Sequence, residues 1–266
     1  MRPWIRAALL LIAGSAALAG RASAQTPFLT DDAEVTGKGH WNFEYFNLYA
    51  VLPKEAAPDH WQEWNNFVIQ YGLLKNLELD VDFPILLINR YTAAVLPDAF
   101  GFGDFDFAAK YKFFDEDPDG WRPAFAASFS IEVPSGNPAT QLGSGYMDFV
   151  WNTIAQRRLS EAVLLHLNVG YQSNGNTLTG AIGIRTPGKI VSEGVSVHVN
   201  VSPTLLLGAD INGAQIRTAH KTDRQLQFTL GGIYTLSSKT NLTFAVLTGW
   251  YDSPRGGVQA GITFSP

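Results

Sequence analysis

Strict alternation of apolar and polar residues limits the possible folds of this sequence more than any other feature. The stretch NLELDVDFPI, residues 76–85, shows it clearly, because successive side chains of an extended chain point to opposite faces. One face carries Leu77, Leu79, Val81 and Phe83, and the other carries Glu78, Asp80 and Asp82. The alternation recurs from Lys38 to the C-terminus in about twelve segments, with almost no helical period. The sequence therefore predicts an all-β fold.

Two all-β folds fit this pattern, a soluble sandwich and a membrane barrel, and the connections between segments distinguish them. After the second, fourth, sixth, eighth and tenth segments the connections are short: LLKN, DEDPDG, RRLSE, SP and LSSK. Several connections after odd-numbered segments are long and rich in Gly and Pro, such as RYTAAVLPDAFGFG and PSGNPATQLGSG. Short turns at one end and long loops at the other are typical of outer-membrane barrels. We therefore predict a transmembrane antiparallel β-barrel of about twelve strands, with both chain ends in the periplasm.

The barrel interpretation also assigns the two faces of NLELDVDFPI. Its leucines, valine and phenylalanine are expected to face lipid, and its three acidic residues are expected to face the lumen. Beyond the first residues, no run is apolar and long enough for a membrane helix, so a spanning structure has to be a closed barrel.

The start of the chain predicts export. Arg2 and Arg6 are followed by an apolar stretch at 7–19 and by the small residues Ala22-Ser23-Ala24, which is the pattern of a secretory signal peptide cleaved before Gln25. The expected organisation is a signal peptide at 1–24, a periplasmic N-terminal segment at 25–37 and an outer-membrane barrel at 38–266. The mature chain would then have 266 − 24 = 242 residues.

Composition excludes several kinds of site. The chain has no cysteine, so it has neither disulfides nor thiolate metal ligands, and its net charge of −5 gives no basic surface for nucleic acid. The glycines of GFGDFD open a strand rather than a helix, so they do not form a phosphate-binding loop. We expect no cofactor and no metal site, because the histidines are scattered at no ligand spacing: His40, His60, His166, His198 and His220.

Charged residues on the predicted lumenal face fall into two groups. Antiparallel pairing should bring Glu78 and Asp80 beside Lys112 and Lys110, as a structural ladder that braces the wall. The second group has no lysine on a neighbouring strand to pair with: Asp104, Asp106, Glu132 and Asp148. We predict that these residues form an acidic patch that selects cations and hydrogen-bonding solutes. The alternative is that these acids pair with loop residues such as Arg90, or hold protons, and only fill the barrel.

A catalytic alternative rests on serine and histidine sharing one face. Ser196 and His198 lie two residues apart, and His166 also projects inward by phase, with Asn168 or Asn200 near. A lipid-cleaving site should face the bilayer, however, whereas these side chains are expected to face the lumen. We therefore expect no enzyme activity.

Several motifs in order also resemble a known family. The strings are TDDAEVTGKGHWNFEY, QYGLLKNLELDVDFPI, GFGDFDFAAKYKFF, SIEVPSGN and LHLNVGY, between Thr30 and about Tyr171. Together they resemble exported barrels of the family named for the meta-pathway of phenol degradation. The chain ends ITFSP, with Phe264 two residues before the end, where many outer-membrane barrels finish on an aromatic residue.

This resemblance implies an outer-membrane β-barrel of a Gram-negative bacterium that passes small molecules. The function we expect is passive uptake or efflux of small organic solutes, aromatic ones included. The partners we expect are outer-membrane lipid, the outer-membrane insertion machinery and the small-molecule solute. The alternatives are a lipid-modifying hydrolase of the outer membrane and a structural or receptor barrel.

Overall fold

The computed structural model describes residues 26–91, 96–173, 188–217 and 222–266. The predicted signal peptide and the predicted long connection around residues 174–187 lie outside these ranges. Within them, no helix has the length and apolar character needed to cross a membrane. The only helix in these ranges is the 3-10 turn η1 (Lys54–Ala56). The strands are β1 (Trp41–Val51), β2 (Asp59–Leu74), β3 (Leu77–Arg90), β4 (Ala99–Phe102), β5 (Phe105–Phe114), β6 (Ala124–Val133), β7 (Asp148–Arg158), β8 (Val163–Ser173), β9 (Lys189–Ser202), β10 (Leu205–Arg217), β11 (Thr222–Ser237), β12 (Thr240–Tyr251) and β13 (Gly256–Phe264).

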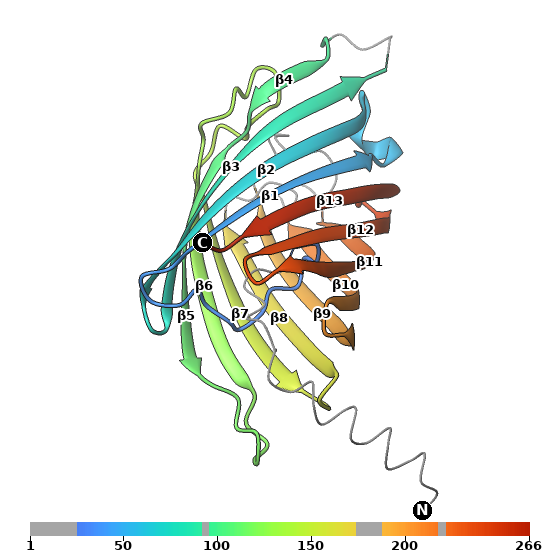
Figure 1. Cartoon of the computed structure of the whole chain (residues 1–266). Helices are drawn as coiled ribbons and strands as arrows, with labels where there is room; N and C mark the ends of the chain where they lie inside the picture. The colour runs from blue at the N-terminus through green and yellow to red at the C-terminus, as the bar shows by residue number, and fades with distance from the viewer. Residues whose placement is uncertain (1–25, 92–95, 174–187, 218–221) are drawn as a thin grey trace, which may run out of the picture.

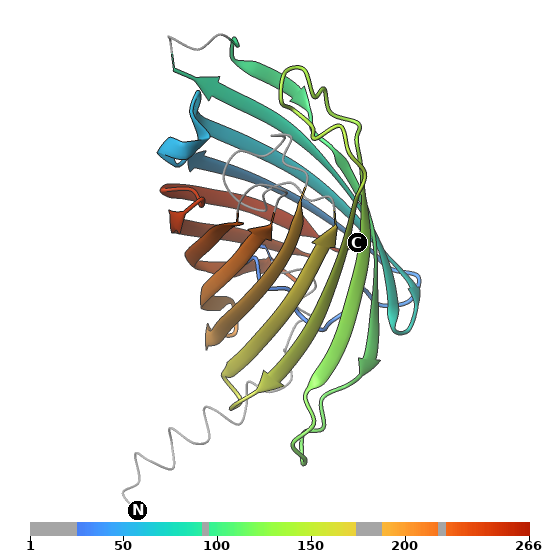
Figure 2. The same ribbon diagram turned by 180° about the vertical axis from the view of Figure 1, so that it is seen from behind.

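All of these strands belong to one antiparallel sheet that closes on itself (Figures 1 and 2). Successive strands pair with each other, except that β5 pairs with β3 and not with β4. β1 pairs with β13, and β2 pairs with β3 to complete the ring. The short β4 and β5 pair with successive parts of β3, at Ile85–Ile88 and Leu77–Asp82, so they act as one interrupted strand. The prediction of a barrel of about twelve strands is therefore confirmed.

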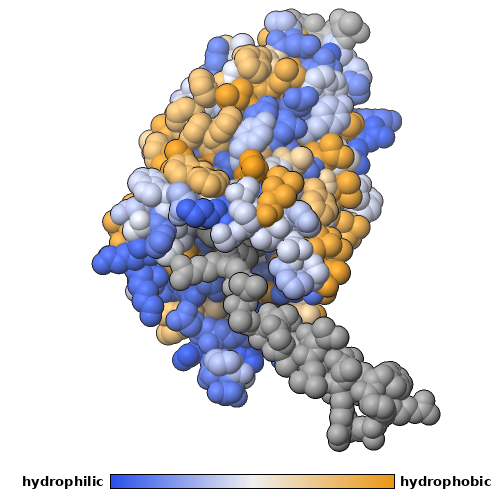
Figure 3. Space-filling model, in the orientation of Figure 1, coloured by the Kyte–Doolittle hydropathy of each residue, from blue (hydrophilic) through white to orange (hydrophobic). Residues whose placement is uncertain are grey.

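The barrel is polar inside and apolar outside. Exposed apolar side chains alternate along the strands with buried polar ones, as Leu79 (39% exposed) does with Glu78 (1% exposed) on β3. Apolar side chains gather over the barrel wall in Figure 3, whereas hydrophilic ones gather at its lower end. The predicted assignment of the two faces of β3 is therefore confirmed, because an apolar outer wall is what a bilayer requires.

Aromatic rings lie on the outer wall near the strand ends. Trp41 is packed against Tyr71 with ring centroids 4.6 Å apart, and both belong to the end where the β2–β3 turn lies. Trp250 lies near the other end, at the end of β12. Tryptophan and tyrosine are favoured at the two membrane–water interfaces. The positions of Trp41, Tyr71 and Trp250 therefore match the two edges of the apolar belt that faces lipid.

A tag inserted after Asn137, in the connection between β6 and β7, should be accessible on intact cells. A tag after Pro118, in the connection between β5 and β6, should become accessible only after permeabilisation. Both residues are exposed, so burial does not favour either site. Antibody labelling of whole cells tests this orientation, and the reverse pattern would mean that the barrel is inverted.

Replacing Val246 with arginine should destabilise the barrel. Val246 is 55% exposed on the outer wall near the middle of β12, and an arginine facing lipid at mid-bilayer costs about 2–4 kcal/mol. Leu236→Arg, beside the β11–β12 turn, is the control and should cost about 1 kcal/mol or less. Urea unfolding in lipid vesicles measures both, and equal losses would contradict the expected depth of Val246.

Candidate functional site

The N-terminal segment preceding β1 lies inside the barrel rather than beside it. We call residues 26–37 the lumenal segment. The backbone amides of Leu29 and Thr30 donate to one oxygen of Asp210 on β10, at 2.7 and 3.2 Å. The Thr30 hydroxyl donates to the other Asp210 oxygen at 2.5 Å, and both side chains are fully buried. The blue coil before β1 crosses the barrel in Figures 1 and 2.

The segment then reaches the opposite wall. The amide of Ala33 donates to Gln156 Oε1 on β7 at 3.1 Å, and the amide of Thr36 donates to Glu78 Oε2 on β3 at 2.5 Å. Around the ring, β3 and β10 are six steps apart through β5, β6, β7, β8 and β9. Residues 30–36 therefore traverse the lumen between opposite sides of a twelve-stranded barrel.

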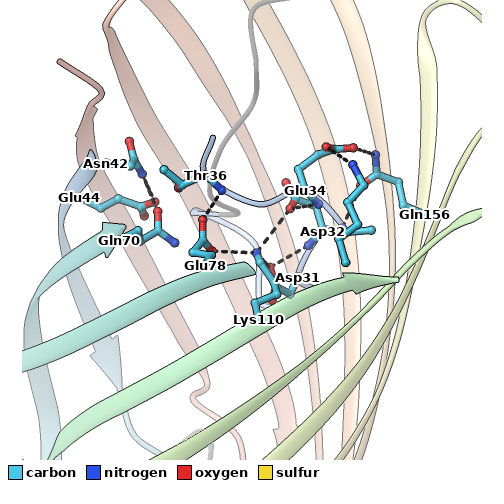
Figure 4. A network of polar contacts seen from close by, with 12 residues as sticks. Asp31, Asp32, Glu34, Thr36, Asn42, Glu44, Gln70, Glu78, Lys110 and Gln156 are labelled. Carbon is cyan, nitrogen blue, oxygen red and sulfur yellow. Dashed lines mark hydrogen bonds and ion pairs between the residues drawn. The ribbon is translucent and has the colours of Figure 1, made fainter. Parts of the chain in front are cut away.

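An ion-pair network holds the middle of the lumenal segment (Figure 4). The Lys110 ammonium on β5 lies 3.3 Å from Asp31, 3.7 Å from Asp32 and 3.5 Å from Glu78. The Lys110 side chain is only 5% exposed. One buried cation thus joins two carboxylates of the lumenal segment to one carboxylate of the wall.

Lys112 lies farther along β5 and has more exposed partners. Its ammonium binds Glu34 of the lumenal segment at 2.7 Å and Asp115 of the β5–β6 turn at 2.8 Å. The hydrogen bond and positive charge of Lys112 lower the pKa of the Asp115 carboxyl.

The predicted ladder thus takes a different form. Register places Glu78 opposite Lys110, as expected of a ladder, but Asp80 lies opposite Ala108, and Lys112 binds the lumenal segment and the turn. The contacts of Asp31, Asp32 and Glu34 were not predicted, because pairing between neighbouring strands says nothing of a segment that crosses the lumen. The available signal was the string TDDAEVTGKG, which carries part of the family resemblance and yet precedes the first strand.

Apolar contacts also hold the lumenal segment against the barrel wall. Ala33 is fully buried in a cluster with Ala124, Ala126 and Ile154, which are inward-facing residues of β6 and β7. Phe28 packs on the His198 ring of β9 with centroids 4.3 Å apart.

Beneath Phe28 lies the group proposed above as a catalytic alternative. The Ser196 hydroxyl lies 3.1 Å from His166 Nδ1 and 3.2 Å from His198 Nε2. All three side chains are buried and face the lumen. The structure therefore does bring these residues together, but on the side away from lipid.

Four acidic residues form a row across β3, β5, β6 and β7. Asp82 on β3 is directly opposite Asp106 on β5, Asp106 is opposite Glu132 on β6, and Glu132 is opposite Asp148 on β7. We call these residues the acidic row: Asp82, Asp106, Glu132 and Asp148. Asp82 and Asp106 each have one buried carboxylate oxygen without a hydrogen-bond partner among the described residues. Asp148 accepts a hydrogen bond from Gln172 on β8 at 3.1 Å.

Asp104, the remaining member of the predicted acidic patch, has a different place. It lies at the break between β4 and β5, and its two oxygens accept hydrogen bonds from the amides of Gly136 (2.9 Å) and Ser144 (2.6 Å). It therefore holds the β6–β7 loop, residues 134–147, instead of joining the acidic row. Alternation along the strand could not reveal this, because the strand is interrupted beside Asp104.

The β6–β7 loop folds inward at the end of the barrel away from the β2–β3 turn. Leu142 of this loop packs on the inward-facing residues Leu86 and Ile88 of β3. Arg90 fixes the loop by donating to Thr140 O and Gln141 Oε1, both at 3.0 Å, and it forms a buried ion pair with Asp59 at 2.7 Å. Among the described residues, the Arg90 guanidinium thus donates to Asp59, to Pro97 O and to the β6–β7 loop, and not to the acidic row.

Removing the charge of Arg90 should destabilise the protein. Arg90→Met leaves the carboxylate of Asp59 buried without its cation, which typically costs about 3–5 kcal/mol. Asp59→Asn combined with Arg90→Met should recover part of this loss, because no buried charge is then left over. Urea unfolding in lipid vesicles measures both, and a double variant no more stable than the single one would contradict this explanation.

Comparison with known proteins agrees with this architecture. The family described as "Putative MetA-pathway of phenol degradation" matches residues 24–265. A crystal structure of the COG4313 outer membrane channel from Pseudomonas putida F1 is similar, with a TM-score of 0.66 at 14% identity, covering 92% of this chain and 100% of that one. The KdgM porin is similar with a TM-score of 0.52 at 9% identity, covering 85% of this chain and 99% of the porin.

The NanC porin gives a TM-score of 0.54 at 6% identity, covering 84% of this chain and 98% of the porin. At these identities the likeness concerns the fold, which is that of outer-membrane barrels. No curated protein matches the sequence. Because the family match spans nearly the whole sequence, the chain belongs to the family of the MetA-pathway of phenol degradation.

Proposed function

We propose that this protein is an outer-membrane channel for small organic solutes, and that the acidic row gives it selectivity. The observation that carries the proposal is the register of the row, in which three successive strand pairs each set two acidic residues directly opposite one another. Like charges in such pairs destabilise a sheet. A row that costs stability and faces the lumen is better explained by contact with a solute than by support of the wall.

The chemistry of the acidic row indicates which solutes it would favour. Carboxylate oxygens accept hydrogen bonds and attract cations, and the buried oxygens of Asp82 and Asp106 have unused acceptor capacity. Solutes that donate hydrogen bonds, or carry positive charge, would therefore be favoured over anions. A phenolic hydroxyl is a donor of this kind, which agrees with the family description.

The hydrolase alternative is less well supported. Ser196, His166 and His198 are at most 3% exposed, and Phe28 lies over His198. A lipid ester in the bilayer would meet the outer face of β8 and β9, where these side chains do not project. We therefore propose that the protein is not an enzyme and that this group stabilises the lumen.

Neutralising the acidic row should reduce cation preference. In Asp82→Asn with Asp106→Asn, the reversal potential under a salt gradient should move toward that of a non-selective pore, because a low-dielectric wall focuses the charge of these groups. The shift should be largest in dilute salt, because the Debye length there exceeds about 10 Å and the charges are screened less. Planar-bilayer recordings measure it.

Asp104→Asn is the comparison variant, since Asp104 binds the β6–β7 loop outside the row. It should shift the reversal potential less than the double variant does. An unchanged potential in the double variant would contradict the role of the acidic row. Correctly folded protein that never passes current would contradict the channel itself.

A further inference from the structure

A hollow lies on the outer wall of the barrel, over β7 near the end that carries the short turns. Ala155 and Arg157 face outward here, because Gln156 between them faces the lumen. Register sets the small Ala155 between two larger side chains, Phe125 on β6 and Leu167 on β8. The hollow has a volume of about 170 Å³, and its largely apolar lining includes these residues: Trp121, Pro123, Ala155, Arg157, Leu165 and Leu167.

A second hollow, of about 400 Å³, adjoins the first and is more polar. The two hollows share Arg157 as a lining residue. The lining of the second has both signs of charge, since it includes Glu116 from the β5–β6 connection and Arg158 at the end of β7. Ser160 adds a hydroxyl to this lining. An apolar hollow beside a charged one matches an amphiphilic molecule, with space for a tail in the first and for a headgroup in the second.

Arg157 holds the chain in the shape that forms both hollows. Its guanidinium donates to the backbone oxygens of Asp117 at 2.8 Å and Gly120 at 2.6 Å. It also forms an ion pair with Glu116 at 3.3 Å. These contacts hold the β5–β6 connection against the outer face of β7, so the donors of Arg157 are used by the protein itself.

Arg158, by contrast, has charge available for a ligand. Its side chain is exposed, and among the described residues its guanidinium forms no ion pair and makes one long hydrogen bond, to Glu161 O at 3.5 Å. A guanidinium binds two phosphate oxygens through parallel N–H donors, and such charge-assisted hydrogen bonds are stronger than neutral ones. Arg158 is therefore placed to bind a phosphate in the second hollow.

Trp121 places the two hollows at the membrane surface. It is 86% exposed, although it belongs to a connection rich in acidic residues. Tryptophan favours the membrane–water interface, where its ring contacts acyl chains and its N–H stays near water. The short turns of outer-membrane barrels face the periplasm. A ligand of these hollows therefore comes from the periplasmic leaflet, which consists of phospholipid.

The charges around the second hollow distinguish between phospholipid headgroups. The β5–β6 connection, DEDPDGWRP at residues 115–123, has more acidic than basic residues, so a headgroup with only negative charge is disfavoured. A headgroup in which an ammonium follows the phosphate complements this hollow, with the phosphate at Arg158 and the ammonium at Glu116. A primary ammonium also donates hydrogen bonds to a carboxylate, whereas a trimethylated one has no N–H to donate.

We propose that the two hollows bind one phospholipid of the periplasmic leaflet whose headgroup is zwitterionic and ends in a primary ammonium. Its acyl chain lies over Ala155 beside Trp121, its phosphate binds Arg158 and its ammonium binds Glu116. The site is on the outside of the barrel, so it is independent of whether the lumen conducts solutes.

Competition between lipids measures the headgroup preference. The purified protein in detergent micelles is mixed with equal amounts of phosphatidylethanolamine, phosphatidylcholine and phosphatidylglycerol that carry the same acyl chains. Native mass spectrometry then records which lipid each barrel retains. We expect one phosphatidylethanolamine per barrel, bound about tenfold more tightly than either competitor, as the loss of one charge-assisted hydrogen bond predicts.

Two variants test the two hollows separately. Ala155→Phe fills the apolar hollow and Arg158→Met removes the phosphate partner, and each should weaken retention of phosphatidylethanolamine about tenfold. The matched controls, Ala209→Phe and Lys239→Met, should retain it as the wild type does. Ala209 also faces outward near the turn end of β10, because Asp210 beside it faces the lumen, and Lys239 is exposed in the β11–β12 turn. Heat-modifiable gel mobility verifies that each barrel is folded.

A third variant tests the contact with the ammonium. Glu116→Gln keeps the shape of the side chain and an acceptor oxygen but removes the charge. It should reduce the preference for phosphatidylethanolamine over phosphatidylcholine and leave retention of phosphatidylcholine unchanged.

The outcomes that would overturn the proposal are distinct from those of the channel recordings, because no current is measured. Equal retention of the three lipids by the wild type, or tighter retention of phosphatidylglycerol, would overturn it. Equal losses in Ala155→Phe and Ala209→Phe would show that any bulky residue on the outer wall has this effect, and would overturn it as well. A loss in only one of Ala155→Phe and Arg158→Met would contradict a site made of both hollows.

Discussion

Backbone hydrogen bonding in lipid is the constraint on which the whole structure depends. Amide and carbonyl groups within a bilayer have no water to bind, so the sheet must leave no edge. Pairing of β2 with β3, from Asp59 opposite Arg90 to Leu74 opposite Leu77, closes the ring. Even at the break between β4 and β5, the amide of Gly103 keeps a hydrogen bond to Pro84 O at 2.9 Å. Alternate residues of a strand point to opposite faces, so in a closed barrel one set of side chains faces lipid and the other set faces the lumen.

A closed barrel with an apolar outer wall has to keep its polar groups inside, and this determines the contents of the lumen. Buried charges are costly unless they are paired. Pairs come partly from segments that are not neighbours in the wall: Lys110 reaches Asp31 and Asp32, Arg90 reaches the β6–β7 loop, and Asp210 receives the amides of residues 29 and 30. Asp82 and Asp106 of the acidic row each keep one buried oxygen without a hydrogen-bond partner among the described residues, as Asp59 and Glu78 of the ion-pair networks do. The interior thus combines two ion-pair networks, around Lys110 and Arg90, with a row of acidic residues on neighbouring strands.

Features that depend on local alternation could be predicted from the sequence, whereas contacts between distant segments could not. Alternation correctly placed Glu78, Asp82 and Asp106 on the lumenal face, since a period of two needs no knowledge of distant residues. Order along the chain suggested that Glu78 and Asp80 lie beside Lys112 and Lys110, whereas the register sets Glu78 opposite Lys110 and Asp80 opposite Ala108. Asp104 was assigned to the acidic patch, but it binds the β6–β7 loop because the strand is interrupted beside it. Ser196 and His198 were expected to share a face, and they do, yet the position of Phe28 above them could not be foreseen.

The sequence by itself determined the class of fold, the approximate number of strands and the faces of those strands, because these depend on local alternation and on connection lengths. Only the tertiary structure decided what fills the barrel. The segment at 26–37 has no strand period, and its contacts join residues that are far apart in the chain, such as Thr30 with Asp210. Such contacts depend on which strands meet across the lumen, and that is settled only when the ring closes. The acidic row depends on closure in the same way, since its members become neighbours through the registers of three strand pairs.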